Sequence, residues 1–148
     1  MRNKDNYDER QIIERGKAFQ IGFMTAIVLS LVTFLVTGLF DIRISAMTVF
    51  GIQTTMPIMV CMMAMILKNA YDPMNKRVAP ILCGIFSVLG LYLVLFSVGR
   101  VLLGQDSFLE GGAVTDTSGF IVVGLSMIGT GIVYLIRKQR NKKELTEE

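Results

Sequence analysis

Four long apolar runs without a single charged residue restrict what this chain can fold into. They cover Ala18–Phe40, Ser45–Leu67, Val78–Gly99 and Gly119–Ile136. A helix needs roughly 20 residues to cross a hydrocarbon core of about 30 Å. The chain has 148 residues, of which 52% are hydrophobic, so it has room for little else. We therefore predict an all-α membrane protein with four transmembrane helices in one antiparallel bundle.

The basic residues predict how this bundle is oriented. Thirteen of the 15 Lys and Arg residues lie before the first run, between the second and third, or after the fourth; Arg43 and Arg100 are the other two. Short basic segments are retained on the cytoplasmic side. The sequence thus predicts cytoplasmic termini, with a cytoplasmic segment 1–17, a transmembrane domain 18–136 and a basic-then-acidic cytoplasmic tail 137–148.

The connections between the runs fit this topology. Phe40–Ile44 is short enough for a tight turn, and Lys68–Arg77 contains an Asp-Pro pair that ends a helix. The first three helices are accordingly expected to be antiparallel neighbours. Arg100–Ser118 is the long connection, and its Gly111 and Gly112 predict a weakly structured lid.

Small residues recur along one side of the first run. Ala18, Gly22, Ala26 and Ser30 follow each other at four-residue intervals, a spacing that lets two helix backbones approach closely in a membrane. The stripe is either a packing face within the chain or a specific oligomer contact. The last two runs carry similar small-residue faces, which could meet each other: Ala79, Cys83 and Ser87 in the third, and Gly124, Ser126, Thr130 and Gly131 in the fourth.

The second run is interrupted by polar residues near its middle. Gln53, Thr54 and Thr55 precede Pro57, which lacks a backbone donor and predicts a kink. This polar break is interpreted either as a kink closed by neighbouring helices or as part of a polar cavity of the kind that transporters use. Proton-coupled transport usually requires an ionisable residue within the membrane, and the four runs contain none.

Sulfur-bearing side chains gather in the second run. It holds Cys61 and five methionines, and Cys83 is expected at a similar depth in the third run: Met56, Met59, Met62, Met63 and Met65 are the methionines. Soft sulfur ligands suit Cu(I), but methionine is also an adaptable filler of apolar gaps, and the chain lacks histidine. We favour packing and expect no metal, no cofactor and no disulfide framework.

Enzymatic chemistry has little support in the sequence. Without histidine, and with every carboxylate in a connection or a tail, no nucleophile, base and acid arrangement can be identified. A Gly-rich phosphate-binding loop is missing as well. The basic stretch Arg137–Lys143 has no interleaved aromatic residues, so it indicates a topology anchor beside anionic lipid rather than a nucleic-acid surface.

The most distinctive segment precedes the first run. Asn6 can cap a helix that has acids at its start and Arg15 and Lys17 at its end, so we predict a helix that continues into the first run. It is either a charged stop whose charges pair internally or a docking surface for a partner. The candidate docking residues are Asp8, Glu9, Arg10, Gln11, Arg15 and Lys17.

This segment also carries a resemblance to a family. The sequence Asp8-Glu9-Arg10-Gln11, followed by Arg15-Gly16-Lys17-Ala18-Phe19, resembles small four-helix membrane proteins of Gram-positive bacteria whose function is unknown, with a further similarity at Asn69-Ala70-Tyr71-Asp72. The resemblance implies a multi-pass protein of the bacterial cytoplasmic membrane, in families often encoded beside small helix-turn-helix regulators. It implies no activity and no catalytic residue.

These observations favour a non-enzymatic accessory or regulatory membrane protein. Its expected partners are the lipid bilayer and either a second copy or another membrane or cytoplasmic protein. A small oligomeric channel or transporter that uses the polar break is the alternative. Immunity against a membrane-active peptide is a third hypothesis, which the sequence neither favours nor excludes.

Overall fold

The computed structural model describes residues 9–68, 70 and 78–144. In these residues it has four helices that are long and apolar enough to cross a membrane, as predicted. The first is α1 (Glu9–Leu39), the third α4 (Val78–Leu102) and the fourth α5 (Asp116–Glu144). The second is one continuous helix built from α2 (Ala46–Phe50), a π-helical turn η1 (Gly51–Thr55) and α3 (Met56–Leu67).

Helices α1, α4 and α5 extend beyond their apolar runs. The charged residues from Glu9 onward form the first turns of α1, as predicted, while the capping residue Asn6 lies outside the described residues. The basic stretch after Ile136 continues α5 to Glu144. Ser45 caps α2, because its Oγ accepts a hydrogen bond from the Thr48 amide at 3.2 Å.

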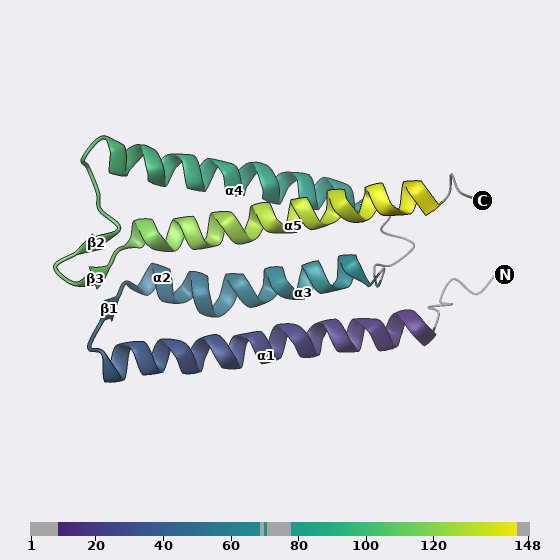
Figure 1. The fold of residues 1–148 in the computed structure, drawn as a ribbon, viewed down its shortest axis with the longest axis horizontal. Coiled ribbons are helices and arrows are strands. Elements are labelled where there is room, and N and C mark those ends of the chain that lie inside the picture. Colours follow the sequence, from purple (N-terminus) through teal and green to yellow (C-terminus); the bar gives the residue numbers. More distant parts are fainter. Residues whose placement is uncertain (1–8, 69, 71–77, 145–148) are drawn as a thin grey trace.

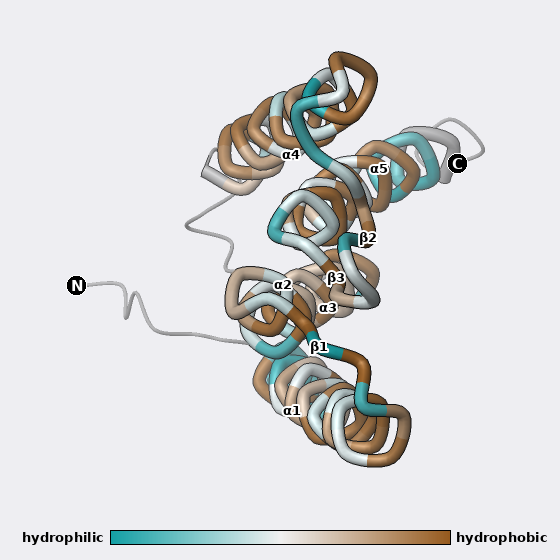
Figure 2. The backbone as a smooth tube through the Cα atoms, turned by 90° about the vertical axis from the view of Figure 1, so that its left-hand side faces the viewer, coloured by the Kyte–Doolittle hydropathy of each residue, from teal (hydrophilic) through white to brown (hydrophobic). Residues whose placement is uncertain are grey.

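The four helices lie in a single row instead of a closed bundle. Figure 1 shows α4, α5, α2–α3 and α1 side by side in that order, and Figure 2 shows along their axes that the row is bent. The main contacts accordingly join α4 to α5, α5 to α2 and α3, and α3 to α1. The prediction that the first three helices are successive neighbours is therefore wrong for α3 and α4, which α5 separates.

Neighbouring helices are antiparallel in the two outer pairs of the row and parallel in the central pair. The pairs α1–α3 and α4–α5 are antiparallel, whereas α3 and α5 run in the same direction (Figure 1). The start of α1, the end of α3 and the end of α5 lie together at one end of the helix axes (Figure 1). We call this end of the molecule the basic end. The opposite end holds three short strands, and we call it the sheet end.

A row one helix thick leaves most apolar side chains uncovered. In α1 only Ala18, Gly22 and Thr33 are buried, while Phe34 is 71% exposed. Exposed Leu, Ile, Val and Phe side chains line α4 and α5 as well. Contiguous apolar surface of this extent is rare on a soluble monomer.

The sheet end carries a three-stranded sheet that the sequence did not predict. Its strands are β1 (Arg43–Ile44), β2 (Leu109–Glu110) and β3 (Ala113–Val114), in the order β1-β3-β2. Gly111 and Gly112 join β2 to β3 with φ of +57° and +80°, the conformation that a two-residue hairpin requires. The expected weakly structured lid is thus an ordered hairpin, because β1 pairs with its second strand.

Candidate functional site

The α1–α3 contact is made by the first half of the small-residue stripe. Ala18 is fully buried, and a Cβ atom added to Gly22 would lie 2.8 Å from Cys61 Cβ and 3.3 Å from the Pro57 carbonyl oxygen. Only glycine fits at that position without moving a helix. The stripe therefore packs within the chain at these two residues.

The second half of the stripe leaves this contact. Ala26 is half-buried and Ser30 is exposed, while Thr33 is buried in its place. Four residues turn an α-helix by about 400°, so each step along the stripe rotates its side chains by about 40° away from α3. A mixed spacing of three and four residues keeps a face in contact, and the even spacing of the stripe does not.

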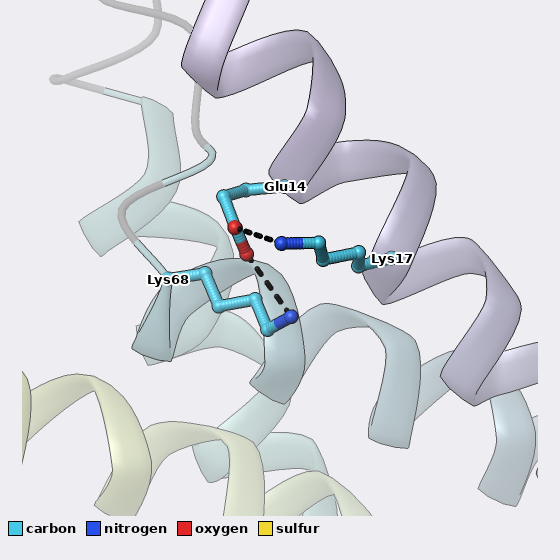
Figure 3. A network of polar contacts seen from close by, with 3 residues as sticks. All are labelled: Glu14, Lys17 and Lys68. Carbon is cyan, nitrogen blue, oxygen red and sulfur yellow. Dashed lines mark hydrogen bonds and ion pairs between the residues drawn. The ribbon is translucent and has the colours of Figure 1, made fainter.

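Charged groups join α1 to the end of α3 at the basic end. Glu14 lies between two lysines, with its carboxylate oxygens 2.7 Å from Lys17 Nζ and 3.0 Å from Lys68 Nζ (Figure 3). These hydrogen bonds from Lys17 and Lys68 hold the pKa of Glu14 below its usual value. Arg15 Nε donates a hydrogen bond of 2.7 Å to the carbonyl oxygen of the buried Ala70.

These contacts divide the six predicted docking residues. Arg15 bonds to the Ala70 carbonyl oxygen beyond the end of α3, and Lys17 pairs with Glu14 of its own helix. Glu9 and Arg10 are exposed on the first turn of α1, and Gln11 is half-buried. Asp8 lies outside the described residues. Among the described docking residues, Lys17 is exposed but paired with Glu14, and the other exposed side chains lie on the first turn of α1.

The predicted polar break is a π-helical turn. The Met56 amide bonds to the Gly51 carbonyl oxygen, five residues back. Such turns widen the helix locally. This one ends two residues before Pro57, whose nitrogen cannot donate to the carbonyl four residues earlier. Within the break Gln53 and Thr55 are half-buried, Thr54 is exposed and Pro57 is buried.

Tight contacts with α5 close one side of the second helix. A Cβ atom added to Gly51 would lie 2.7 Å from Val123 Cγ2, and one added to Gly119 would lie 2.8 Å from the backbone of Thr48. The Thr48 hydroxyl, which is 2% exposed, donates a hydrogen bond of 2.8 Å to the Thr115 carbonyl oxygen. Helices α2, η1 and α5 therefore pack as one unit near the sheet end.

The two cysteines lie at different interfaces. Cys61 faces Gly22 of α1, whereas Cys83 is buried where α4 meets α5. Since α5 separates their helices, the prediction that they sit on neighbouring helices is wrong. Among the methionines, Met59 is buried against α5, where its sulfur accepts a hydrogen bond of 3.5 Å from the Thr130 hydroxyl. No group of three potential metal ligands among His, Cys, Asp and Glu occurs in the described part of the chain.

The small-residue faces of the last two helices meet in part. Gly124 and Gly131 lie against α4, whereas Thr130 contacts Met59 of α3. Gly90 and Gly124 lie against each other, since a Cβ atom on Gly90 would be 2.6 Å from the Gly124 carbonyl oxygen and one on Gly124 would be 2.8 Å from that of Gly90. A Cβ atom on Gly131 would overlap the Ser87 hydroxyl. Gly124, Ser87 and Gly131 belong to the faces that the sequence predicts, and Gly90 is a further contact residue that the prediction does not include.

Sequence reasoning also missed two hollows on the surface. An apolar groove of about 350 Å³ lies between α1 and α3, with Gly22 and Cys61 in its floor. A hollow of about 540 Å³ at the sheet end is lined by charged side chains, including Arg43, Arg100 and Glu110. Their positions in three separate segments gave no signal that they converge.

Comparison with protein-family models, with curated proteins and with solved structures finds no match for this chain. Its function is therefore argued from its own geometry.

Proposed function

We propose that this chain crosses a bacterial cytoplasmic membrane four times, with the basic end of the row in the cytoplasm. Two observations support this. The exposed apolar side chains extend along all four helices, and a bilayer is the solvent that accepts such a surface. Thirteen of the 15 Lys and Arg residues lie in the sequence before the first apolar run, between the second and third, or after the fourth. These segments adjoin the helix termini at the basic end, which favours its retention in the cytoplasm.

Within that membrane we propose a non-enzymatic accessory or regulatory role in which α1 contacts a partner. The observation that carries this is the poor packing of α1 in its own chain. It is 31 residues long, α3 is its main neighbour, and its buried residues are Ala18, Gly22 and Thr33. The side of α1 that faces away from these three residues carries Met24 and Leu31, and Phe34 lies beside it. All three are exposed, and this surface is available to a helix of another protein.

The first turn of α1 extends this surface beyond the membrane. Glu9 and Arg10 are exposed there, and they are followed by Ile12 and Ile13, which are 56% and 58% exposed. Exposed apolar side chains bordered by charged residues are typical of a protein contact, in which a polar rim surrounds an apolar core. A cytoplasmic partner, or the cytoplasmic part of a membrane partner, would bind here.

Site-specific crosslinking in native membranes tests this role. A photoreactive side chain at Phe34 is expected to give one stoichiometric crosslinked partner, while the same group at the buried Thr33, its neighbour in sequence, gives only contacts within the chain. Replacing Glu9 and Arg10 by Gln should release a cytoplasmic partner. Lipid as the sole neighbour of Phe34, together with a partner-free native mass after gentle extraction, would contradict the accessory role.

The channel or transporter alternative rests on the π-helical turn. Such turns are frequent at functional sites, and the half-buried Gln53 and Thr55 lie within this one. A transporter of this kind should catalyse solute flux in liposomes that Gln53→Leu abolishes. A homo-oligomeric native mass with measurable flux would favour this alternative over the accessory role.

A further inference from the structure

The hollow at the sheet end brings together charges of both signs. Its volume is about 540 Å³, and it lies between the sheet, the end of α4 and the start of α5. Its charged lining residues are Arg43, Arg100, Asp106, Glu110 and Asp116. They come from four segments, so the fold alone places them around one space.

The register of the sheet places two of these charged residues, Arg43 and Glu110, on the same face with one strand between them. Arg43 of β1 is level with Ala113 of β3, and Ala113 is level with Glu110 of β2. Residues level with each other across a sheet project from the same face. Two strand spacings of about 4.8 Å place the Arg43 and Glu110 backbones about 10 Å apart, with only the small Ala113 side chain between them.

The remaining walls of the hollow are held by hydrogen bonds. Asp106 Oδ2 lies 2.9 Å from Arg100 Nη2 and accepts a hydrogen bond of 3.0 Å from the Thr117 hydroxyl. The Thr115 hydroxyl donates to the Ser107 carbonyl oxygen at 2.5 Å, and the Ser45 amide donates to the Val114 carbonyl oxygen at 2.9 Å. The charges therefore stand on a fixed frame.

Three of the five charged groups are left without an opposite charge. In the part of the chain that the structure describes, Arg43, Glu110 and Asp116 form no ion pair, whereas Arg100 and Asp106 pair with each other. Arg100 has five N–H donors and uses one nitrogen for Asp106, so it can also contact an anion. One cation and two carboxylates thus face the same space with their charges unmatched.

We propose that this hollow binds a small zwitterion, a molecule with a phosphate or carboxylate a short distance from an ammonium group. Arg43, with Arg100 beside it, contacts the anionic group, and Glu110 and Asp116 contact the ammonium group. Ala113 leaves the space between them open for the body of the ligand. A molecule with a single charge satisfies only one side of the hollow.

Such a zwitterion has two sources. It is either a free solute or the head group of a zwitterionic phospholipid. Exposed leucines border the sheet end, with Leu102 81%, Leu103 75% and Leu109 65% exposed, so the hollow lies beside the surface expected to meet lipid. The two sources present the same chemistry to Arg43 and Glu110 and are separated by experiment.

The test uses the full chain in nanodiscs of phosphatidylglycerol, with phosphoethanolamine as the probe and calorimetry as the readout. Phosphoethanolamine should bind at least about tenfold more tightly than either ethanolamine or glycerol phosphate, because each lacks one charge-assisted contact. Arg43→Gln and Glu110→Gln should each weaken binding about tenfold. Arg140→Gln, at an exposed position of the basic end, is the matched control and should leave binding unchanged.

Repeating the titration in nanodiscs that contain phosphatidylethanolamine identifies the source. Weaker apparent affinity there means that the lipid head group competes for the hollow, and equal affinity means that a free solute is the ligand.

Ala113→Leu should abolish binding in both cases because it fills the hollow, and an unchanged unfolding temperature shows that it still folds. No binding of phosphoethanolamine, binding no tighter than that of the two single-charge compounds, or binding that Arg43→Gln and Glu110→Gln leave intact would overturn the proposal. None of these readouts requires the partner of α1, so the two proposals fail independently.

Discussion

The two antiparallel pairs of the row are built differently. Between α4 and α5, the backbones of Gly90 and Gly124 lie in close contact with each other, and Ser87 lies against Gly131. Between α1 and α3, a single glycine, Gly22, accepts the partner backbone, and the polar contacts of Glu14 add to it. The α4–α5 contact has a glycine on both helices. The α1–α3 contact has a glycine on α1 alone, and ion pairs at the helix ends add to it.

This difference shows how one chain can be rigid and yet keep a helix available. In a membrane, helix association depends on close packing rather than on the hydrophobic effect. The reciprocal glycines make α4 and α5 a fixed core, which α2 and α3 join through Gly51 and Gly119. Helix α1 has fewer such contacts, and its proposed role as the partner-binding helix rests on this difference. The predictions below test this contrast.

The largest effect is expected at the reciprocal contact. Gly90→Leu places a side chain where a Cβ atom alone comes within 2.6 Å of a backbone oxygen, so α4 and α5 must separate, at a cost of about 3 kcal/mol. Denaturation in mixed micelles measures it. Gly84→Leu is the control on the same helix, because nothing lies within 4 Å of that position. Equal stability of the two variants would contradict the fixed core.

Gly22→Leu should have a smaller and more local effect. It meets Cys61 and Pro57 of α3 and is expected to cost about 1 to 3 kcal/mol by moving α1 while α4 and α5 stay packed. Spin labels on α1 and α3, and on α4 and α5, measure the two distances separately. Gly38→Leu lies on the same helix in open space and should change neither distance. If α4 and α5 also moved apart, α1 would belong to the core.

Thr48→Val tests whether α2 belongs to the fixed core. It removes the hydroxyl that donates to the Thr115 carbonyl oxygen and leaves that oxygen without this partner, at a cost of about 1 kcal/mol. Micelle denaturation measures the loss, with Thr54→Val, at an exposed position of the same helix, as the control. A result equal to the control would limit the core to α4 and α5.

The smallest effect is expected at Glu14. Because Lys17 and Lys68 lower its pKa in the folded chain from the ordinary 4.5, its contribution to stability is present above pH 4.5 and is lost as the pH falls through the lowered value. Glu14→Gln should therefore reduce the stability of the α1–α3 contact at neutral pH and change little in acid. The spin-label distance between α1 and α3, followed over pH, checks this. A difference between the two proteins that persists in acid would contradict it.

The sequence predicts the helices well and their order poorly. The four apolar runs and the charged start of α1 form helices as expected, since length and composition determine them. The neighbour of α4 depends on which glycines face each other. Gly90 follows Ser87 by three residues, so a search for even four-residue spacings does not reach it. The predicted packing stripe of α1 is too long, because an even four-residue spacing rotates its side chains away from α3, and Ser30 is already exposed.

The sheet end was missed for a different physical reason. Strands of two residues are too short for an alternating pattern, so Arg43-Ile44 and Ala113-Val114 carry no periodic signal. Gly111 and Gly112 were interpreted as a source of freedom, whereas here they supply the two positive φ angles of a tight hairpin. The convergence of Arg43 and Glu110 around one hollow depends on that pairing, and sequence spacing does not contain it.

The parallel pair α3 and α5 also sets the order in which the molecule can be assembled. Chains are made from the N-terminus, so α4 is synthesised while its eventual neighbour has not yet left the ribosome. The last helix must then enter between two helices that are already present, and only its arrival joins the two halves of the row. If the chain spans a membrane as proposed, a product that stops after Leu102 lacks the helix that packs between α3 and α4. Its α4 is then joined to the α1–α3 pair only through the connecting chain, and the product is expected to be a substrate for membrane proteases.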